Sequence, residues 1–141
     1  MEQRITCITL GVADVAKARA FYEKLGWRAG KGGDANVAFF QLNGLVLGLF
    51  GKKDLAHDAG VARPGIGFGN VSIAHNVGSA AEVRKTITQA KRAGATILRK
   101  PSKAFWGGYT AYFADPDGHA WEAAYNPFWK LDSKGNVKLP K

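Results

Sequence analysis

The sequence predicts an α+β protein made of two repeated modules, each reading strand, helix, strand, strand, strand. Three observations lead to this class. A strand pattern that runs into an amphipathic helix and stops at a glycine occurs twice, at residues 8–26 and 71–94. Later in each half, an aromatic pair is followed by a tight turn and an apolar strand. Runs of strands with one helix per half are typical of α+β proteins rather than of doubly wound sheets.

The first module, expected over about residues 1–55, opens with a strand and a helix. Residues 4–12 alternate weakly and predict the strand. Asp14 can cap the helix, because its carboxylate can accept from the free amides of the first turn. Gly26 supplies the left-handed residue that ends it. One face of this helix is apolar at helical spacing, through Val15, Ala18, Phe21, Tyr22 and Leu25.

Three further strands complete the first module. One is expected to begin at residues 27–29, and two more at residues 37–42 and 45–50. The Asn-Gly pair between the last two favours a hairpin turn. Residues 51–65 differ in composition from both flanks, so they are expected to be a linker between the modules.

The second module, about residues 66–127, repeats this order with a stronger helix signal. Its first strand is expected at residues 67–76. Ser79 and Glu82 have the spacing of a capping box, in which each side chain bonds the other's backbone amide. Val83, Ile87 and Ala90 form the apolar face, and Gly94 closes the helix.

The remaining strands of the second module are expected at residues 95–99, 109–114 and 119–125, with a loop at 100–104. The last two strands are joined by Asp-Pro-Asp-Gly, which is turn chemistry. Aspartates bond their own backbone, and glycine accepts a positive φ. Residues 128–141 are expected to be a tail or a small hairpin outside the module.

Composition limits the classes of function. The hydrophobic fraction is 46%, as in ordinary globular proteins, and no apolar run approaches the roughly 20 residues that span a bilayer. The start of the chain runs directly into a strand pattern, not a signal segment, and the single cysteine, Cys7, cannot form an internal disulfide. A cytoplasmic protein with no membrane partner is therefore expected.

The formal net charge of +9 has two interpretations. An acidic partner is one, and a soluble protein with many surface lysines is the other. The cations are spread along the chain and form no stripe with interleaved aromatic residues, which a nucleic-acid surface usually has. We therefore expect no nucleic-acid partner.

The repeat itself indicates where to look for chemistry. Setting Gly44 on Gly118 places Gly48 against Glu122, and setting Leu10 on Ile73 places Cys7 against Asn70. A duplicated fold makes its pocket between the two copies. These four positions, Cys7, Gly48, Asn70 and Glu122, are the first candidates for a site.

Several motifs resemble those of the vicinal oxygen chelate superfamily, the group of glyoxalase I, bleomycin-resistance proteins and extradiol dioxygenases. The resemblance covers most of residues 5–127. Its motifs lie at residues 9–15, 20–27, 93–98, 106–109, 113–119 and 121–122. It implies a single domain of two βαβββ modules whose sheets curl into a half-open barrel around a cavity, and a homodimer. In metal-using members, four histidine or glutamate side chains reach into the cavity from the first and last strands of each module.

The residues at these positions do not make that metal site. Only Glu122 retains a usual ligand type, since Gly48 has no side chain and Asn70 offers a weak carbonyl oxygen. Cys7 could bind a soft metal as thiolate, but catalytic zinc sites normally have three protein ligands. We expect no cofactor. If a divalent metal did bind, its ligands would be Glu122, Cys7 and Asn70.

Glu122 has two interpretations. In a dry cavity its carboxylate could act as a general base or acid, and it is the candidate catalytic residue. Alternatively, hydrogen bonds hold it as a remnant of metal-binding relatives. The candidate ligand-binding residues are Cys7, Asn70 and three aromatic side chains that could wall a pocket, Trp106, Tyr109 and Trp121. Packing under the helices is the competing role for these aromatics, and His119 is expected at the surface or barrel rim.

Two functions from different classes remain. One is a protein of the bleomycin-resistance type that binds a small, partly apolar or anionic molecule in the cavity without chemistry. The other is a lyase, isomerase or dioxygenase of the glyoxalase type that uses Glu122 as base or metal ligand. The fold alone does not choose between them.

Overall fold

A computed structural model describes residues 3, 7–31, 33–58, 69 and 71–138. The chain divides into two compact units, Met1–Gly67 and Phe68–Lys141. The strand, helix and turn patterns recur in both, so the predicted α+β class is confirmed. In the described part of the chain, none of the helices has the length and apolar character needed to cross a membrane.

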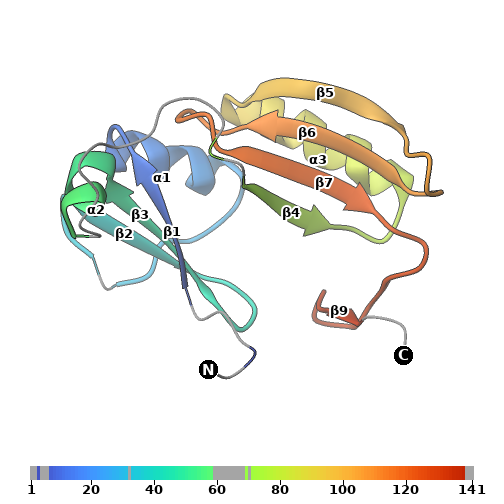
Figure 1. Ribbon diagram of the computed structural model, residues 1–141, viewed down its shortest axis with the longest axis horizontal. Coiled ribbons are helices and arrows are strands. Elements are labelled where there is room, and N and C mark those ends of the chain that lie inside the picture. The colour runs from blue at the N-terminus through green and yellow to red at the C-terminus, as the bar shows by residue number, and fades with distance from the viewer. Residues whose placement is uncertain (1–2, 4–6, 32, 59–68, 70, 139–141) are drawn as a thin grey trace. The chain divides into compact units, whose positions relative to one another are not determined.

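The first unit contains an open three-stranded sheet in the order β1-β3-β2 (Figure 1). Its strands are β1 (Cys7–Val12), β2 (Val37–Gln41) and β3 (Val46–Gly51). β1 and β3 are parallel, whereas β2 and β3 form an antiparallel hairpin. The strand expected to begin at residues 27–29 is reduced to one bridge, between Ala29 and Phe40.

Helix α1 (Val15–Lys24) covers one face of this sheet (Figure 1). As predicted, Asp14 caps it, accepting from the Lys17 amide at 2.9 Å. Phe21 and Tyr22 are buried, and the Tyr22 ring lies 5.8 Å from that of Phe40 on β2. Apolar burial on this helix-facing side forms the core of the unit.

Part of the segment expected as a linker, residues 51–65, is a helix, α2 (Lys52–Asp58), which the sequence analysis did not predict. Residues 59–65 lie outside the described residues. Packing explains the helix: a Cβ added at Gly11 would lie 3.1 Å from Lys52 Cβ and 3.3 Å from Leu55 Cδ2. The absence of a side chain at Gly11 therefore lets α2 approach β1 closely.

The second unit has an open four-stranded sheet in the order β4-β7-β6-β5. The strands are β4 (Ser72–Asn76), β5 (Thr96–Lys103), β6 (Tyr109–Ala114) and β7 (Ala120–Tyr125). β4 and β7 are parallel and the other two pairs antiparallel, which repeats the connectivity of the first unit. β5 runs to Lys103, beyond the predicted end at residue 99, because register irregularities carry it past Pro101.

Helix α3 (Ala80–Ala93) packs on one face of this sheet (Figure 1). Ser79 caps it by accepting from the Glu82 amide at 3.2 Å, as predicted. The return bond of the capping box differs from the prediction, since the Glu82 carboxylate accepts from the Gly78 amide, at 2.7 Å. Gly94 ends the helix at φ 106°, in the left-handed region.

After β7, the strands β8 (Lys130–Leu131) and β9 (Val137–Lys138) pair antiparallel in a small hairpin. Asp132 stabilises its turn by accepting from the backbone amides of Lys134 and Asn136.

Candidate functional site

Strand β7 presents two chemically different faces. Neighbouring side chains on a strand point to opposite sides of the sheet. Trp121 is 5% exposed and stacks on Phe113 at a ring distance of 6.3 Å. Glu122, the next residue, therefore points to the face opposite α3. The register places Glu122 beside Tyr112 on β6 and beside Ala74 on β4.

This placement separates the aromatic residues that the sequence suggested as one pocket wall. Tyr109 and Trp121 belong to the helix-facing side, where the Arg84 guanidinium of α3 lies 5.5 Å from the Tyr109 ring centroid. Packing under the helix, the alternative role for these aromatic residues, therefore fits the positions of Tyr109 and Trp121 better than lining a pocket with Glu122 does. Neither shares a face with Glu122, so the expectation that they line one site with it is corrected.

Trp106 lies on neither strand face. It occupies the turn between β5 and β6, closed by hydrogen bonds from the Gly107 amide to the Ala104 carbonyl and from the Ala104 amide to the Gly108 carbonyl. Its ring folds over Gly108, where an added Cβ would collide with it. Trp106 is 37% exposed and the adjacent Phe105 is fully exposed.

The Tyr112 hydroxyl connects Glu122 to its surroundings. It donates a hydrogen bond to the Glu122 carboxylate and accepts one from the Ser72 hydroxyl. Burial, followed by the charge and hydrogen bond of Glu122, raises the pKa of Tyr112 above its ordinary value. The nearby Arg99 charge and the Ser72 hydrogen bond oppose this rise. At neutral pH Tyr112 is thus a neutral hydrogen-bond donor that orients the carboxylate.

Arg99 joins the same face through a β-bulge. Ile97 pairs with Phe113 on the helix-facing side, but Arg99 pairs with Tyr112, so one extra residue, Leu98, reverses the alternation. The Arg99 guanidinium lies 4.9 Å from the Tyr112 ring centroid, a cation–π contact, and donates to the Thr110 hydroxyl. Two contacts thus fix the position of this cation.

Four residues in register across the sheet make up what we call the Glu122 row: Arg99, Tyr112, Glu122 and Ala74. Strands lie about 4.8 Å apart, so the row extends over roughly 14 Å of sheet. It carries one cation, one carboxylate and a phenol that touches both.

The equivalent positions in the first unit form the Gly48 row: Phe39, Gly48 and Thr9. A Cβ at Gly48 would lie 3.2 Å from Thr9 Oγ1 and 3.4 Å from Phe39 Cε1, so the phenylalanine ring packs over the glycine backbone. This row has no charge and no carboxylate.

The two rows also correct the alignment of the repeat. Cys7 lies two residues before Thr9, the partner of Gly48, and Ser72 lies two residues before Ala74, the partner of Glu122. The counterpart of Cys7 is therefore Ser72, not Asn70, which lies outside the described residues. A two-residue shift keeps every side chain on its face, so the hydrophobic pattern does not reveal it.

The side chains around Glu122 do not fit the family's metal ion. Around Glu122 stand two hydroxyl groups and a guanidinium, and a cation beside the carboxylate opposes the binding of a second one. Cys7, which lies in the other unit, has its Sγ 3.7 Å from Thr9 Oγ1. Within the ranges that the structure describes, no three His, Cys, Asp or Glu side chains gather as a metal site would require.

The two histidines of the second unit, His75 and His119, lie away from the Glu122 row. His75 pairs with Ala123 on the helix-facing side of the sheet. Burial lowers the pKa of its imidazole, although the side chain retains contact with solvent. His119 follows the β6–β7 turn and is partly exposed, as expected.

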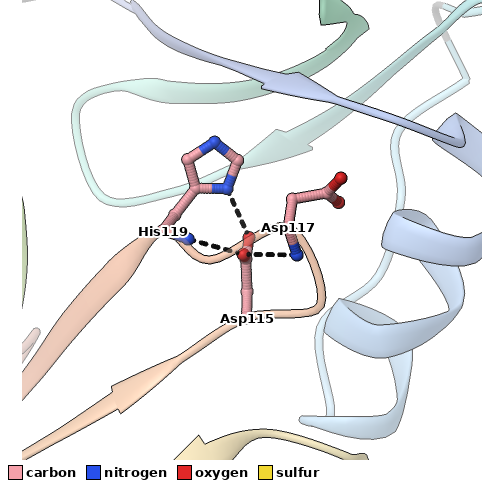
Figure 2. A network of polar contacts seen from close by, with 3 residues as sticks. All are labelled: Asp115, Asp117 and His119. Atoms are coloured by element: carbon pink, nitrogen blue, oxygen red, sulfur yellow. Dashed lines mark hydrogen bonds and ion pairs between the residues drawn. The ribbon is translucent and has the colours of Figure 1, made fainter. Parts of the chain in front are cut away.

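The β6–β7 turn is built around buried Asp115 (Figure 2). One carboxylate oxygen accepts from the backbone amides of Asp117 and His119, at 3.0 and 2.9 Å. The other lies 2.8 Å from His119 Nδ1. With Gly118 at φ 87°, this is the turn chemistry that the Asp-Pro-Asp-Gly sequence predicted.

Sequence reasoning chose Glu122 but left its immediate partners out of the site. Tyr112 could have been identified from the sequence. It lies as far before the turn at residues 116–118 as Glu122 lies after it, so the hairpin pairs the two residues. Arg99 could not, because nothing in the alternation marks the bulge at Leu98. Ser72 was not identified because the sequence alignment of the two modules was shifted by two residues in the first strand of the second module.

Comparison with known proteins agrees with this architecture. A family model described as the Glyoxalase/Bleomycin resistance protein/Dioxygenase superfamily matches residues 4–123. A solved glyoxalase-related enzyme from Fulvimarina pelagi is 35% identical, with a TM-score of 0.91, over 99% of this chain and 100% of that chain. No curated protein matches the chain by sequence.

More distant structures show the fold alone. A glyoxalase/bleomycin resistance protein/dioxygenase from Nocardioides is 23% identical, with a TM-score of 0.75, over 99% of this chain and 91% of that one. A lactoylglutathione lyase from Agrobacterium tumefaciens is 21% identical, with a TM-score of 0.71, over 92% and 98%. The chain belongs to the glyoxalase/bleomycin resistance protein/dioxygenase superfamily, as its motifs indicated.

Proposed function

We propose that this protein binds a small, partly apolar or anionic molecule on the Glu122 row, without the family's metal centre. The observation that carries the proposal is the position of Tyr112, which contacts a fixed cation on one side and a carboxylate on the other. Binding sites usually combine apolar surface with a few well-positioned polar groups.

The surroundings of the row support a ligand of modest size. Along β7, the residues two positions from Glu122 on the same face are Ala120 and Ala124, and Ala74 lies opposite on β4. Small side chains therefore flank the carboxylate, and the Tyr112 ring on β6 offers apolar surface. The Arg99 guanidinium would bind an anionic group in a bidentate manner.

Calorimetric titration with benzoate, which combines an apolar ring with an anion, tests the proposal. We expect Arg99→Gln to weaken binding about tenfold, the equivalent of about 1.4 kcal/mol. Arg92→Gln, which removes the same charge from the exposed end of α3, is the matched control and should bind like the wild type. Equal affinities for all three proteins, or no binding by the wild type, would refute the proposal.

A second candidate is proton transfer by Glu122. The hydrogen bond from Tyr112 orients the carboxylate, as a general base requires. In such a reaction Glu122 takes a proton from a carbon beside a carbonyl, the electron pair moves to the oxygen as an enolate, and Arg99 stabilises that charge.

Hydrogen exchange into pyruvate in D2O tests this second candidate by proton NMR. If Glu122 is a base, the wild type accelerates loss of the methyl signal and Glu122→Gln returns the rate to the buffer background. Exchange that is equally fast in both proteins, or no faster than buffer, rules the reaction out and leaves binding alone.

We also propose that the chain is cytoplasmic, as its sequence led us to expect, and, from family resemblance, that it forms a homodimer. Sedimentation velocity would support the dimer by a mass near twice 15.1 kDa. A mass near that of a single chain at micromolar concentration would contradict it.

A further inference from the structure

The Glu122 row carries two opposite charges that have separate partners. The Arg99 guanidinium is held by the Thr110 hydroxyl and the Tyr112 ring. The Glu122 carboxylate is held by the Tyr112 hydroxyl. Side-chain ion pairs join Arg19 to Glu23 and Asp115 to His119, and neither pair involves this row.

The absence of a direct pair between these two residues has a geometric cause. Arg99 and Glu122 lie on β5 and β7, with β6 between them, so their Cα atoms are about two strand spacings, roughly 10 Å, apart. The Tyr112 ring fills the space between the two groups. Each charge therefore keeps hydrogen-bonding capacity: the guanidinium has further donors, and the carboxylate has further acceptor positions.

We propose that the ligand of this site is two-ended, with an anionic group that meets Arg99 and an ammonium group that meets Glu122, joined by a short apolar segment over Tyr112. This inference rests on the proposed binding function and specifies its ligand class. A simple anion satisfies only Arg99 and places a negative charge near Glu122, whereas a zwitterion satisfies both. The match of opposite charges at both ends gives selectivity rather than affinity alone.

The contrast with the Gly48 row supports a specific role for the pair. The same strand positions in the first unit carry Phe39, Gly48 and Thr9, so the fold is formed there without either charge. Ion-pairing groups on a half-exposed face also contribute little to folding stability. Folding stability therefore does not explain the presence of Arg99 and Glu122, whereas selection of a two-ended ligand does.

Calorimetric titration with three matched probes tests the inference: 4-(aminomethyl)benzoate, benzoate and benzylamine. We expect the wild type to bind the zwitterion at least about tenfold more tightly than either single-charge probe. Glu122→Gln should remove the preference for the zwitterion over benzoate while benzoate binding stays equal or improves. Arg99→Gln should weaken both of these probes.

The outcomes separate the two proposals. If benzoate binds as tightly as the zwitterion, or if Glu122→Gln leaves the preference unchanged, the two-ended ligand is wrong and the binding site stands. If none of the probes binds the wild type, both proposals fail. The comparison of probes on the wild type needs no variant, so a folding defect in a mutant cannot obscure it.

Discussion

The two units of this protein share one strand order and differ at one row of residues. In each unit a parallel strand pair and an antiparallel hairpin surround the same central strand, β3 or β7. The Gly48 row is closed by a phenylalanine ring packed on glycine. The Glu122 row places a tyrosine hydroxyl, a carboxylate and a guanidinium at corresponding positions. The scaffold therefore forms with either set of side chains, and we propose that the difference serves ligand binding.

The helix-facing sides of the two sheets are alike, so equivalent core changes should cost similar stability. Phe40→Ala in the first unit and Trp121→Ala in the second should each lower the free energy of unfolding by about 3–5 kcal/mol, because each removes a buried aromatic ring. Urea denaturation followed by circular dichroism measures both. Phe105→Ala, at a fully exposed ring, is the control and should change stability by less than about 0.5 kcal/mol.

If either Phe40→Ala or Trp121→Ala left the free energy of unfolding unchanged, the proposed equivalence of the two helix-facing sides would be contradicted. Such a result would mean that the corresponding sheet does not depend on its helix-facing side for stability.

Making the second row resemble the first should remove function from it. Tyr112→Phe deletes the hydroxyl that orients Glu122, so we expect zwitterion affinity to fall about tenfold while benzoate affinity stays near the wild-type value. Stability should fall by about 1 kcal/mol, the typical net value of one hydrogen bond. Calorimetry and denaturant unfolding measure the two effects.

The reverse change is the matched control. Phe39→Tyr adds a hydroxyl beside Gly48, where the row has no carboxylate to receive it, so probe affinity should stay at the wild-type value. An equal loss of affinity in both variants would show that the rows do not differ in the way described here.

The raised pKa of Tyr112 gives a smaller, pH-dependent effect. The folded state retains the phenol proton at a pH where the unfolded chain, with a pKa near 10, has lost it. The stabilisation is therefore complete below about pH 10 and is lost as the pH rises through the folded value. Compared with Tyr112→Phe, the wild type should lose stability as the pH rises above about 10, as measured by urea midpoints. Parallel pH profiles for the two proteins would contradict this.

The smallest effect on folding stability is expected from the protonation of His75 at acidic pH. Its lowered pKa means that the unfolded chain takes up a proton near pH 6.5, before the folded protein does. Stability is thus complete above pH 6.5 and falls as the pH drops through the folded value. His75→Asn should weaken this dependence as the pH falls below about 6.5. An unchanged slope in thermal melts over that range would count against the assignment.

Much of the fold was readable in the sequence because local signals agreed with each other. Asp14, Ser79 and Gly94 each cap a helix as their residue types predict. The α2 helix was missed because its seven residues give a weak signal of their own and it packs on β1, which composition does not reveal.

The site was predicted less completely, for reasons of register. Glu122 was found because the hairpin turns at Gly44 and Gly118 align the last strands of both modules. Ser72 was missed because a shift of two residues leaves the polar pattern unchanged. Arg99 reaches the row only through a bulge, a long-range feature of strand pairing that alternation along one strand cannot show.

The central claim is that the Glu122 row, and not its counterpart, binds the ligand. The most direct test is a titration of isotopically labelled protein with 4-(aminomethyl)benzoate, followed by backbone amide chemical shifts. The account predicts the largest shifts at Arg99, Tyr112 and Glu122, with little change at Phe39 and Gly48. Shifts centred on the first unit, or on the helix-facing side around Trp121, would contradict it.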